Sequence, residues 1–499
     1  MSASDRNEEL DRYIIRHLDD RQAVARRVLL ALRDGDLNGP ARKRYLRFVF
    51  KLSSYLDAFQ YSCVYAIVTK GQAPDPSGFG RLDLLDRLYP ALSGWLFDCL
   101  VRDKPSLPPF EGLQGAMLVS RILEGVVRHL YSLCEFGAAE AVSRLHAAID
   151  RSFQMKSADW VFSSSFIHNI GHFAYLASII EMNRRGHLTG QPIKVRTGPT
   201  TNQFMYRTFA ESLIEDIPTG TQFVEEISGF KRHRLSDGTS MRMSELVSVA
   251  ATYWANDRPF AALDSATVEQ GDAALAELGV AADTPIVTLH VREPGYLRDH
   301  ASRMAPRDAD VTSYHEAVRY LTGRGYAVVR LGDETMTPLP DWQGVIDYPF
   351  SGKKADWMDV YLAARCRFHV GTSSGMSFIP LLFARPVLFT NWSAMAHVVC
   401  APNVVTLPKT LLGPDGERVP LAEYCNRYGW IFEQCDADLL KARFVDNTAE
   451  ELRDAVRFVD AYTDPETGKL AVPESEVAEA RSIFANSILK IAPTIAPAG

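Results

Sequence analysis

Ile286-Val287-Thr288-Leu289-His290-Val291-Arg292 and, further along, Phe368-His369-Val370-Gly371-Thr372-Ser373-Ser374-Gly375 mark the stretch that decides the fold, residues 284–392. Each begins with a short apolar run typical of a buried strand and ends in polar or small residues. Between them lie predicted helices at 311–323 and 356–366 and predicted strands at 326–331 and 345–348, with a further strand at 386–389. Short strands alternating with helices predict an α/β fold with a parallel sheet and helices on both faces.

Polar residues of this stretch fall where its predicted strands end. His290 and Arg292 follow the first strand, Asp333 follows the strand at 326–331, and a loop of small residues, the 371–375 loop, follows the strand that begins at Phe368. In parallel α/β sheets, ligands bind at the carboxyl ends of the strands. The sequence therefore predicts a ligand site at this edge.

Size, charge and cysteine content narrow the class of protein. A chain of 499 residues predicts two or three domains, and a net charge of -7 argues against a dedicated nucleic-acid-binding protein. Seven cysteines without paired spacing indicate reduced thiols. Residues 1–10 lack the apolar core of a signal peptide, and the uncharged residues 386–408 contain prolines and polar side chains that do not suit a membrane span. We expect a cytoplasmic protein without a transmembrane segment, with peripheral membrane association left open.

Changes in pattern along the chain predict four regions. Residues 1–155 form a helical N-terminal region, with candidate helices at 12–32, 44–69 and 113–134, which is structural, binds a protein partner or self-associates. Residues 156–280 and 281–440 form two Rossmann-like domains, the first opening with a strand at 160–162, a helix at 173–182 and a strand at 193–196. Strand signals fade after Leu407. Residues 441–499 form C-terminal helices that pack back across the domains, one capped by Thr448 and Glu451 and the last ending in a frayed segment at 493–499.

Arg292 is the first candidate for binding phosphate. Positions two apart on a strand share a face, so His290 and Arg292 point the same way. The arginine fork suits phosphate oxygens, and Arg298, Arg303 and Arg307 follow closely in the chain. The alternative is that Arg292 only pairs with Glu293 or another acid. We expect His290 to orient the loop or the arginine rather than to act as a base.

The 371–375 loop, made of Gly371, Thr372, Ser373, Ser374 and Gly375, connects a strand to a predicted helix. Its small residues would let a ligand approach the backbone, its three hydroxyls would donate hydrogen bonds, and the N–H groups of the helix's first turn would point outward. The pattern indicates a diphosphate or sugar site, whereas the alternative is a simple helix N-cap. Asp333 either accepts from a ribose or base edge or forms a turn, and Asp356 is expected to be an N-cap.

His172 is the candidate general base, because a histidine beside Gly171 would face a cleft between the two domains. The alternative is a residue that packs against Ser164 or Ser165. His168 and His172 lack a third ligand nearby, so no metal site is expected. The basic cluster at 231–234 is either a solvated loop or a wall facing an anionic substrate. Two Asp-Ala-Asp triplets, at 308–310 and 436–438, are interpreted as structural.

Several of these motifs together resemble a bacterial family of glycosyltransferase-like proteins that is often found with surface-polysaccharide genes. They are His290-Val-Arg-Glu-Pro-Gly-Tyr296, Arg307-Asp-Ala-Asp310, Tyr314, Arg330-Leu-Gly-Asp333, Asp347-Tyr348, the 371–375 loop and Pro386-Val-Leu-Phe-Thr-Asn391. The His-x-Arg element is also similar to that of fucosyltransferases, in which the arginine contacts the GDP diphosphate. The serine-rich loop is similar to the donor loop of heptosyltransferases. The resemblance covers roughly residues 156–440.

The resemblance implies a GT-B fold, in which two Rossmann-like domains face each other and the C-terminal one binds the donor nucleotide. It implies a metal-independent glycosyltransferase that uses a nucleotide sugar, with a GDP-sugar favoured, and a glycan or other hydroxyl acceptor in polysaccharide biosynthesis. His290, Arg292, Asp333 and the 371–375 loop would bind the donor, and His172 and Arg292 would be catalytic. The alternatives are a nucleotide-sugar epimerase or hydrolase of the same fold and a non-catalytic sugar-nucleotide-binding assembly subunit.

Overall fold

The computed structural model describes residues 259–496 except 296–300, 430, 432 and 488–492, residues 160–215 except 163 and 187–192, and two strands at 232–234 and 240–242. N-terminal to these it describes 3–18 and scattered positions up to 145. The chain divides into two compact units, residues 1–159 with 218–231 and residues 160–217 with 232–499. The boundaries predicted near residues 155, 280 and 440 stay predictions.

The described part of the N-terminal unit begins with helix α1, Ala3–Arg16. The continuous helix predicted at 12–32 is wrong, because α1 ends at Arg16 and the chain turns before Asp20. Asp20 accepts hydrogen bonds from the N–H groups of Ala23 (2.9 Å, to Oδ1) and Val24 (3.0 Å, to the carbonyl), and so starts a new helical turn. The other helices predicted for residues 1–155 lie largely outside the described residues.

Six parallel strands form the central sheet of the second unit. They are β6 (Ile286–His290), β7 (Ala327–Arg330), β8 (Val345–Asp347), β9 (Phe368–Gly371), β10 (Val387–Trp392) and β11 (Val404–Pro408). Their order, β11-β10-β9-β6-β7-β8, is the 3-2-1-4-5-6 order of doubly wound sheets when it is read from β8. The parallel α/β sheet predicted from the sequence is therefore confirmed. Its topological switch point lies between β6 and β9.

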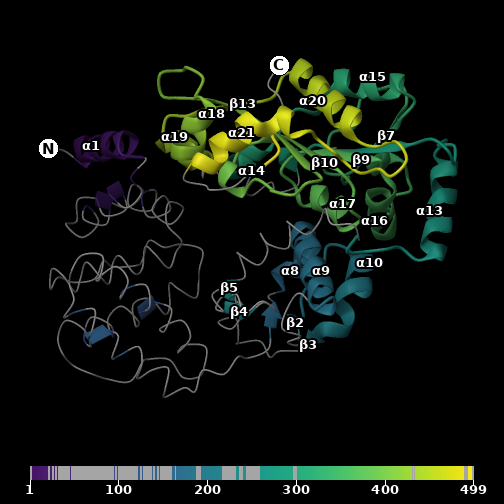
Figure 1. Cartoon of the computed structure of the whole chain (residues 1–499), viewed down its shortest axis with the longest axis horizontal. Coiled ribbons are helices and arrows are strands. Elements are labelled where there is room, and N and C mark those ends of the chain that lie inside the picture. The colour runs from purple at the N-terminus through teal and green to yellow at the C-terminus, as the bar shows by residue number, and fades with distance from the viewer. Residues whose placement is uncertain are drawn as a thin grey trace. The chain divides into compact units, whose positions relative to one another are not determined.

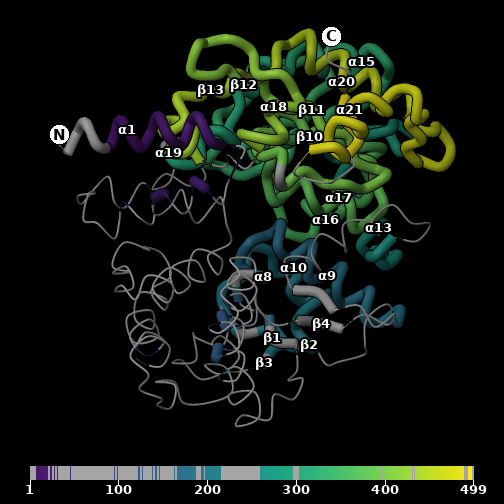
Figure 2. Tube along the Cα trace, turned by 60° about the vertical axis from the view of Figure 1, so that its left-hand side comes forward, coloured from purple at the N-terminus to yellow at the C-terminus, as the bar shows by residue number. Residues whose placement is uncertain are grey.

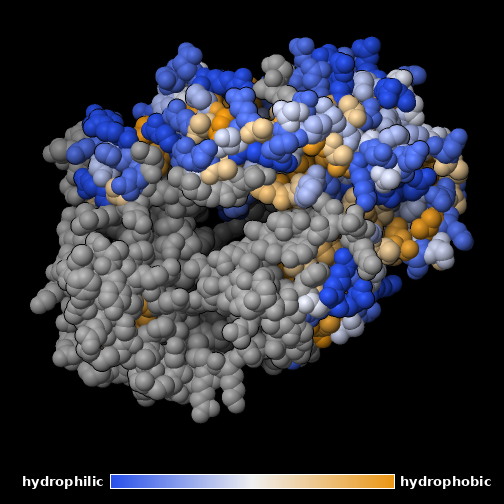
Figure 3. Space-filling view, in the orientation of Figure 1, coloured by the Kyte–Doolittle hydropathy of each residue, from blue (hydrophilic) through white to orange (hydrophobic). Residues whose placement is uncertain are grey.

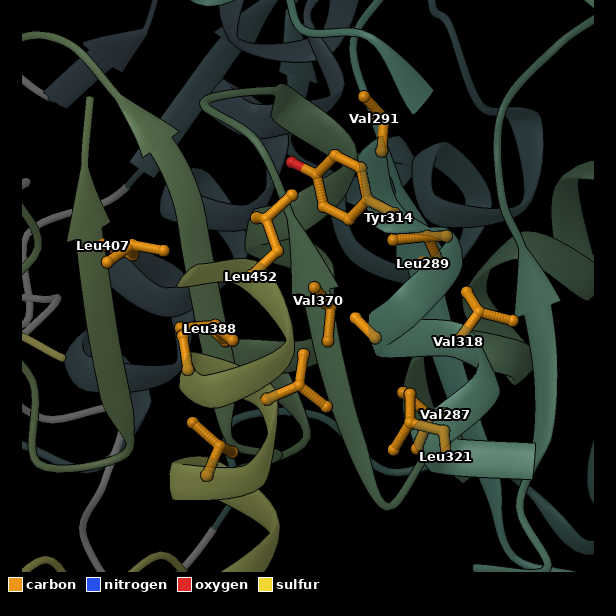
Figure 4. Packing of buried hydrophobic residues seen from close by; sticks show 14 of the residues in the cluster. Val287, Leu289, Val291, Tyr314, Val318, Leu321, Val370, Leu388, Leu407 and Leu452 are labelled. Atoms are coloured by element: carbon orange, nitrogen blue, oxygen red, sulfur yellow. The ribbon is translucent and has the colours of Figure 1, made fainter. Parts of the chain in front are cut away.

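Helices α15 (His315–Gly323) and α20 (Ala449–Tyr462) cover one face of the sheet and lie side by side in both views (Figures 1 and 2). Their apolar residues pack on alternate positions of the strands. Figure 4 shows Leu321 and Leu452 from these helices against Val287, Val370 and Leu388. The predicted capping box of α20 is confirmed, since Thr448 Oγ1 accepts from Glu451 N (3.2 Å) and the Glu451 carboxylate accepts from Thr448 N (2.8 Å).

The opposite face is covered by α13 (Ser265–Glu277), α16 (Asp356–Arg365) and α17 (Ile379–Leu382). Gly271 of α13 has no room for a side chain, because the ring of Tyr361 on α16 occupies the position of its Cβ. The N-cap of α13 is Asp264, whose carboxylate accepts from Thr267 N at 2.7 Å.

A small sheet precedes this domain in the same unit. Its parallel strands are β1 (Trp160–Phe162), β2 (Ile193–Arg196) and β3 (Ile214–Glu215), and its helices include α8 (Ser165–His168) and α9 (Ile170–Arg184), with α10 (Gln203–Met205) and η1 (Tyr206–Ala210) between β2 and β3. The strands and the helix predicted at 160–196 are present. A hairpin of β4 (Arg232–Arg234) and β5 (Ser240–Arg242) occupies most of the basic cluster. The interpretation of that cluster as a loop is therefore wrong for 232–234.

The C-terminal part corrects two further predictions. The sequence predicts no strand over Val404–Pro408, where β11 lies, because the last strand that it predicts is at 386–389. Residues 493–499 were expected to be frayed, yet Thr406 N donates to Thr494 O and Ala496 N donates to Thr406 O, both at 2.9 Å. Because β11 is an edge strand, its free backbone groups pair with this segment.

The remaining elements connect or cover these layers. They are η2 (Glu211–Leu213), α14 (Ala301–Met304), η4 (Ala305–Arg307), η5 (Val311–Tyr314), η6 (Tyr348–Phe350), η7 (Gly375–Phe378), η8 (Met395–His397), β12 (Thr410–Leu412), α18 (Leu421–Glu423), η9 (Tyr424–Tyr428), α19 (Gln434–Leu439), β13 (Arg443–Val445) and α21 (Glu474–Asn486). Strands β12 and β13 pair antiparallel.

Hydrophilic side chains dominate the described surface in Figure 3, and Val268 and Phe350 are its exposed large hydrophobic residues. Among the described residues, no helix combines the length and the apolar character needed to cross a membrane. Cysteines 366, 400, 425 and 435 are free thiols. The other three cysteines, at 63, 99 and 134, lie outside the described residues.

Candidate functional site at the sheet switch point

The loops that follow β6 and β9 are joined at the switch point. Thr372 N donates to His290 O (3.0 Å), and Arg292 N donates to Thr372 Oγ1 (2.9 Å). Both side chains, His290 and Arg292, are buried. The structure thus brings together His290, Arg292 and the 371–375 loop, as expected from strands that end at one edge.

His290 is held in one tautomer by its two partners. Its Nδ1 lies 3.1 Å from Leu331 O, and because a carbonyl only accepts, Nδ1 carries the hydrogen. Burial lowers the pKa of His290 to about 4, so the ring is neutral near pH 7 and its Nε2 is an acceptor. Ser374 Oγ, 2.9 Å away, therefore donates to Nε2. In this arrangement the Ser374 hydroxyl oxygen is left as an acceptor, and the expectation that Ser374 donates to a ligand stays a prediction.

Both glycines of the 371–375 loop are required by internal packing. A Cβ on Gly375 would lie 2.8 Å from Gly171 N, and a Cβ on Gly371 would overlap Ser377 Oγ and His369 Nε2. Helix α9 therefore approaches Gly375 at the place where a ligand was expected. Gly171 is equally constrained, with its Cβ position 2.8 Å from Gly375 Cα.

The element after this loop is shorter than predicted. A single turn of 3₁₀ helix, η7, precedes the four residues of α17, so the helix-dipole contribution to anion binding is small. Ser374 occupies the N-cap position of η7 but makes no side-chain capping bond, so the simple N-cap alternative is not what the loop shows either. The side chains of Ser373 and Ser374 are half-buried, and their hydroxyl oxygens could contact a ligand.

Arg292 donates to Met304 O (3.4 Å) and forms an ion pair with Asp308. The alternative in which Arg292 pairs with an acid is thus observed, with Asp308 rather than Glu293 as the partner. Glu293 instead pairs with Arg330 (2.5 Å). Burial raises the pKa of Asp308 to about 6, against the opposing effects of Arg292 and Lys409.

Two more cations lie beside Arg292. Arg307 donates from Nε to Ser373 O (3.0 Å), and the buried Lys409 donates to Asp308 O (2.7 Å) and to Asp446 Oδ1 (2.6 Å). Burial and the charge of Arg292 lower the pKa of Arg307 to about 10. We call Arg292, Arg307 and Lys409 the cation cluster. The carboxylates of Asp308 and Asp446 balance part of this charge, and an anion placed beside the two arginines would be stabilised by the positive charge that remains.

Lys409 was not predicted, because it directly follows the missed strand β11. Asp308 was interpreted as structural, although it contacts the cluster. Arg303 instead forms an ion pair with Glu433 (3.6 Å), and Arg298 lies outside the described residues. A pocket of about 400 Å³ adjoins the cluster and is lined by residues that include Asp308 and Lys409.

Asp333 and Asp356 have local roles. Asp333 Oδ1 accepts from Thr335 N (2.9 Å) and from Thr335 Oγ1 (2.5 Å), which is the turn that the sequence predicts as one alternative. The prediction that Asp356 is an N-cap is wrong, because Ala355 occupies that position. Asp356 Oδ2 accepts from Gln203 N (2.7 Å) and so joins α16 to α10.

His172 is exposed at the start of α9, next to the glycine that packs on the 371–375 loop. Its ring centroid lies 5.5 Å from that of Phe166. His168 is exposed as well. Among the residues that the structure describes, no group of three or more His, Cys, Asp or Glu side chains is arranged to hold a metal ion.

Comparison of the chain with protein-family models, curated proteins and solved structures finds no match.

Proposed function

We propose that this chain is a glycosyltransferase of GT-B type, which transfers a sugar from a nucleotide sugar to the hydroxyl of a glycan or similar acceptor without a required metal ion. The doubly wound sheet supports a nucleotide-binding role, because such sheets bind nucleotides at their switch point. The small sheet at 160–215 would belong to the acceptor-side domain. Surface polysaccharide or glycoconjugate synthesis in the cytoplasm is the setting we propose.

The cation cluster is the observation that carries the proposal. Arg292 follows β6, and Arg307 of η4 donates to Ser373 O in the loop that follows β9, so both side chains lie beside the switch point, where the donor diphosphate would bind. In the transfer, the acceptor oxygen bonds to the anomeric carbon while the bond from that carbon to the phosphate oxygen breaks. The nucleoside diphosphate leaves with the electron pair, and the two arginines would stabilise its charge.

The acceptor proton needs a base, and His172 keeps this role in the proposal. It is exposed and lies beside the contact between Gly171 and Gly375, so a substrate at the 371–375 loop would be close to it. A histidine is suited to proton transfer near neutral pH. Asp333 would hold the nucleoside through the carboxylate oxygen that its turn does not use.

A thermal-shift screen tests the phosphate assignment. We expect GDP, UDP, ADP, CDP or dTDP to raise the melting temperature of the full chain without magnesium, because a ligand that binds the folded state stabilises it. Arg292→Ala should weaken the binding of the active nucleotide about ten-fold or more, since a charge-assisted hydrogen bond is lost. Arg319→Ala, which removes an exposed arginine from α15, is the control. Equal affinity of the Arg292 variant and the control would remove the support for the proposal.

A further inference from the structure

The pocket beside the cation cluster has the size of a small-ligand site. Its volume of about 400 Å³ falls in the range of roughly 300–1,000 Å³ that such sites occupy. Its wall comes from the segment after β6, from Lys409 after β11, and from α19 and β13. The lining residues on which the inference depends are Asp308, Asp310, Lys409, Arg443, Phe444 and Asp446.

Charges in the pocket nearly balance one another. Three carboxylates, of Asp308, Asp310 and Asp446, face two cations, Lys409 and Arg443. Lys409 is bound to Asp446 at 2.6 Å, and Asp308 is paired with Arg292. A phosphate would meet the three carboxylates and a free cation would meet the two positive side chains, so neither suits the pocket. A neutral ligand does.

The same groups present donors and acceptors side by side. Lys409 uses two of its three N–H groups in bonds to Asp308 O and Asp446 Oδ1, and Arg443 is an exposed donor on β13. Each carboxylate can accept more hydrogen bonds than these partners donate to it. Hydroxyl groups, which both donate and accept, match such a wall. Phe444, with Pro294 and Pro306, adds apolar surface against which the C–H face of a ring can pack.

We propose that this pocket binds one sugar residue, a neutral ring with several hydroxyls and an apolar face. The inference deepens the proposed function and rests on it, because the sugar would lie next to the cluster that binds the diphosphate. Asp308 links the two sites, since it pairs with Arg292 and lines the pocket. The sugar belongs either to the donor or to the acceptor, and the test separates these sources.

Saturation-transfer-difference NMR on the full chain, with a panel of neutral methyl glycosides and disaccharides, tests the pocket. The panel is measured alone and with the nucleoside diphosphate that stabilises the protein. We expect at least one sugar to bind and Arg443→Ala and Phe444→Ala each to weaken it about ten-fold. Arg319→Ala serves as the matched control, because it also removes an exposed arginine but lies outside the pocket.

No sugar binding in either condition would overturn the inference, as would binding that neither pocket variant weakens. Arg443→Ala removes an exposed side chain, so it remains informative if Phe444→Ala does not fold. A sugar that is displaced by the intact nucleotide sugar is the donor's sugar, whereas one that binds alongside it is the acceptor's. Sugar binding without nucleotide binding would refute the proposed function and keep the pocket. Nucleotide binding without sugar binding would refute the sugar pocket and leave the proposed function in place.

Discussion

Two buried arginines at neighbouring strand ends differ in how their charge is balanced. Arg330, the last residue of β7, is fully buried and lies between Glu293 (2.5 Å) and Asp347 (3.1 Å), and it also donates to Thr337 O (2.8 Å). Arg292, just past β6, forms an ion pair with Asp308, and two further cations, Arg307 and Lys409, lie close by. Both residues lie at the carboxyl ends of the strands, which is the edge where doubly wound sheets generally bind ligands.

We propose that this difference separates a structural arginine, Arg330, from a ligand-binding one, Arg292. Two carboxylates already neutralise Arg330, so an added anion would gain little there. Arg292, Arg307 and Lys409 lie together with two carboxylates, of Asp308 and Asp446, so an anion would relieve the repulsion that remains among the cations. Burial alone does not distinguish the two residues. The charges around them do, because Arg330 lies between two carboxylates, whereas Arg292 has other cations close by.

Arg330→Met gives the largest expected effect. It leaves the carboxylates of Glu293 and Asp347 partly buried without their cation, and breaking a buried ion pair in this way costs roughly 3–5 kcal/mol. Urea denaturation would measure the loss in the free energy of unfolding. Nucleotide affinity of the folded fraction should stay unchanged.

Arg292→Met is the matched control for this comparison. Asp308 keeps Lys409 beside it after the substitution, so the loss of stability should be smaller than for Arg330→Met, while nucleotide binding weakens. Equal losses of stability in the two variants, or weaker nucleotide binding in the Arg330 variant, would contradict the division into structural and binding arginines.

The buried His290 makes the stability of the folded chain depend on pH. Burial lowers its pKa from 6.5 to about 4, so the unfolded chain binds more protons than the folded chain between these values. Stability therefore rises with pH across this window and is lost as pH falls from 6.5 to 4, by roughly 3 kcal/mol for this residue. The buried His369, with a pKa lowered to about 3, adds a loss of the same sign.

Denaturation at several pH values checks this prediction. His290→Asn should flatten the dependence between pH 6.5 and 4, although His369 still contributes. An unchanged slope would mean that His290 is not held neutral by its burial.

Much of the sheet could be predicted from the sequence, because its strands are short β-branched runs with polar residues at their ends. This pattern located His290, Arg292 and the 371–375 loop at one edge. It failed at β11, although the turn at Pro402-Asn403 directly precedes this strand within the uncharged stretch 386–408.

Side-chain partners could not be predicted, because they depend on contacts between distant segments. Asp308 lies 16 residues from Arg292, and Gly171 meets Gly375 across more than 200 residues. Glu293 is the nearest acid in sequence to Arg292, but its carboxylate forms an ion pair with Arg330. Local sequence therefore indicated the residue types of the site and left their pairing open.

Asp308→Asn gives the smallest expected effect and tests the balance of charge most directly. The carboxylate of Asp308 forms an ion pair with Arg292, so it would compete with a phosphate for the same guanidinium. Removing its charge should tighten nucleoside diphosphate binding by roughly 1 kcal/mol, about five-fold, as measured by isothermal titration calorimetry. Asp310→Asn makes the same change in net charge two residues away, where the carboxylate holds Thr312 rather than Arg292, and should alter affinity less. Weaker binding in the Asp308 variant would show instead that this carboxylate positions Arg292 for the ligand, and the cluster would then act as a preformed unit.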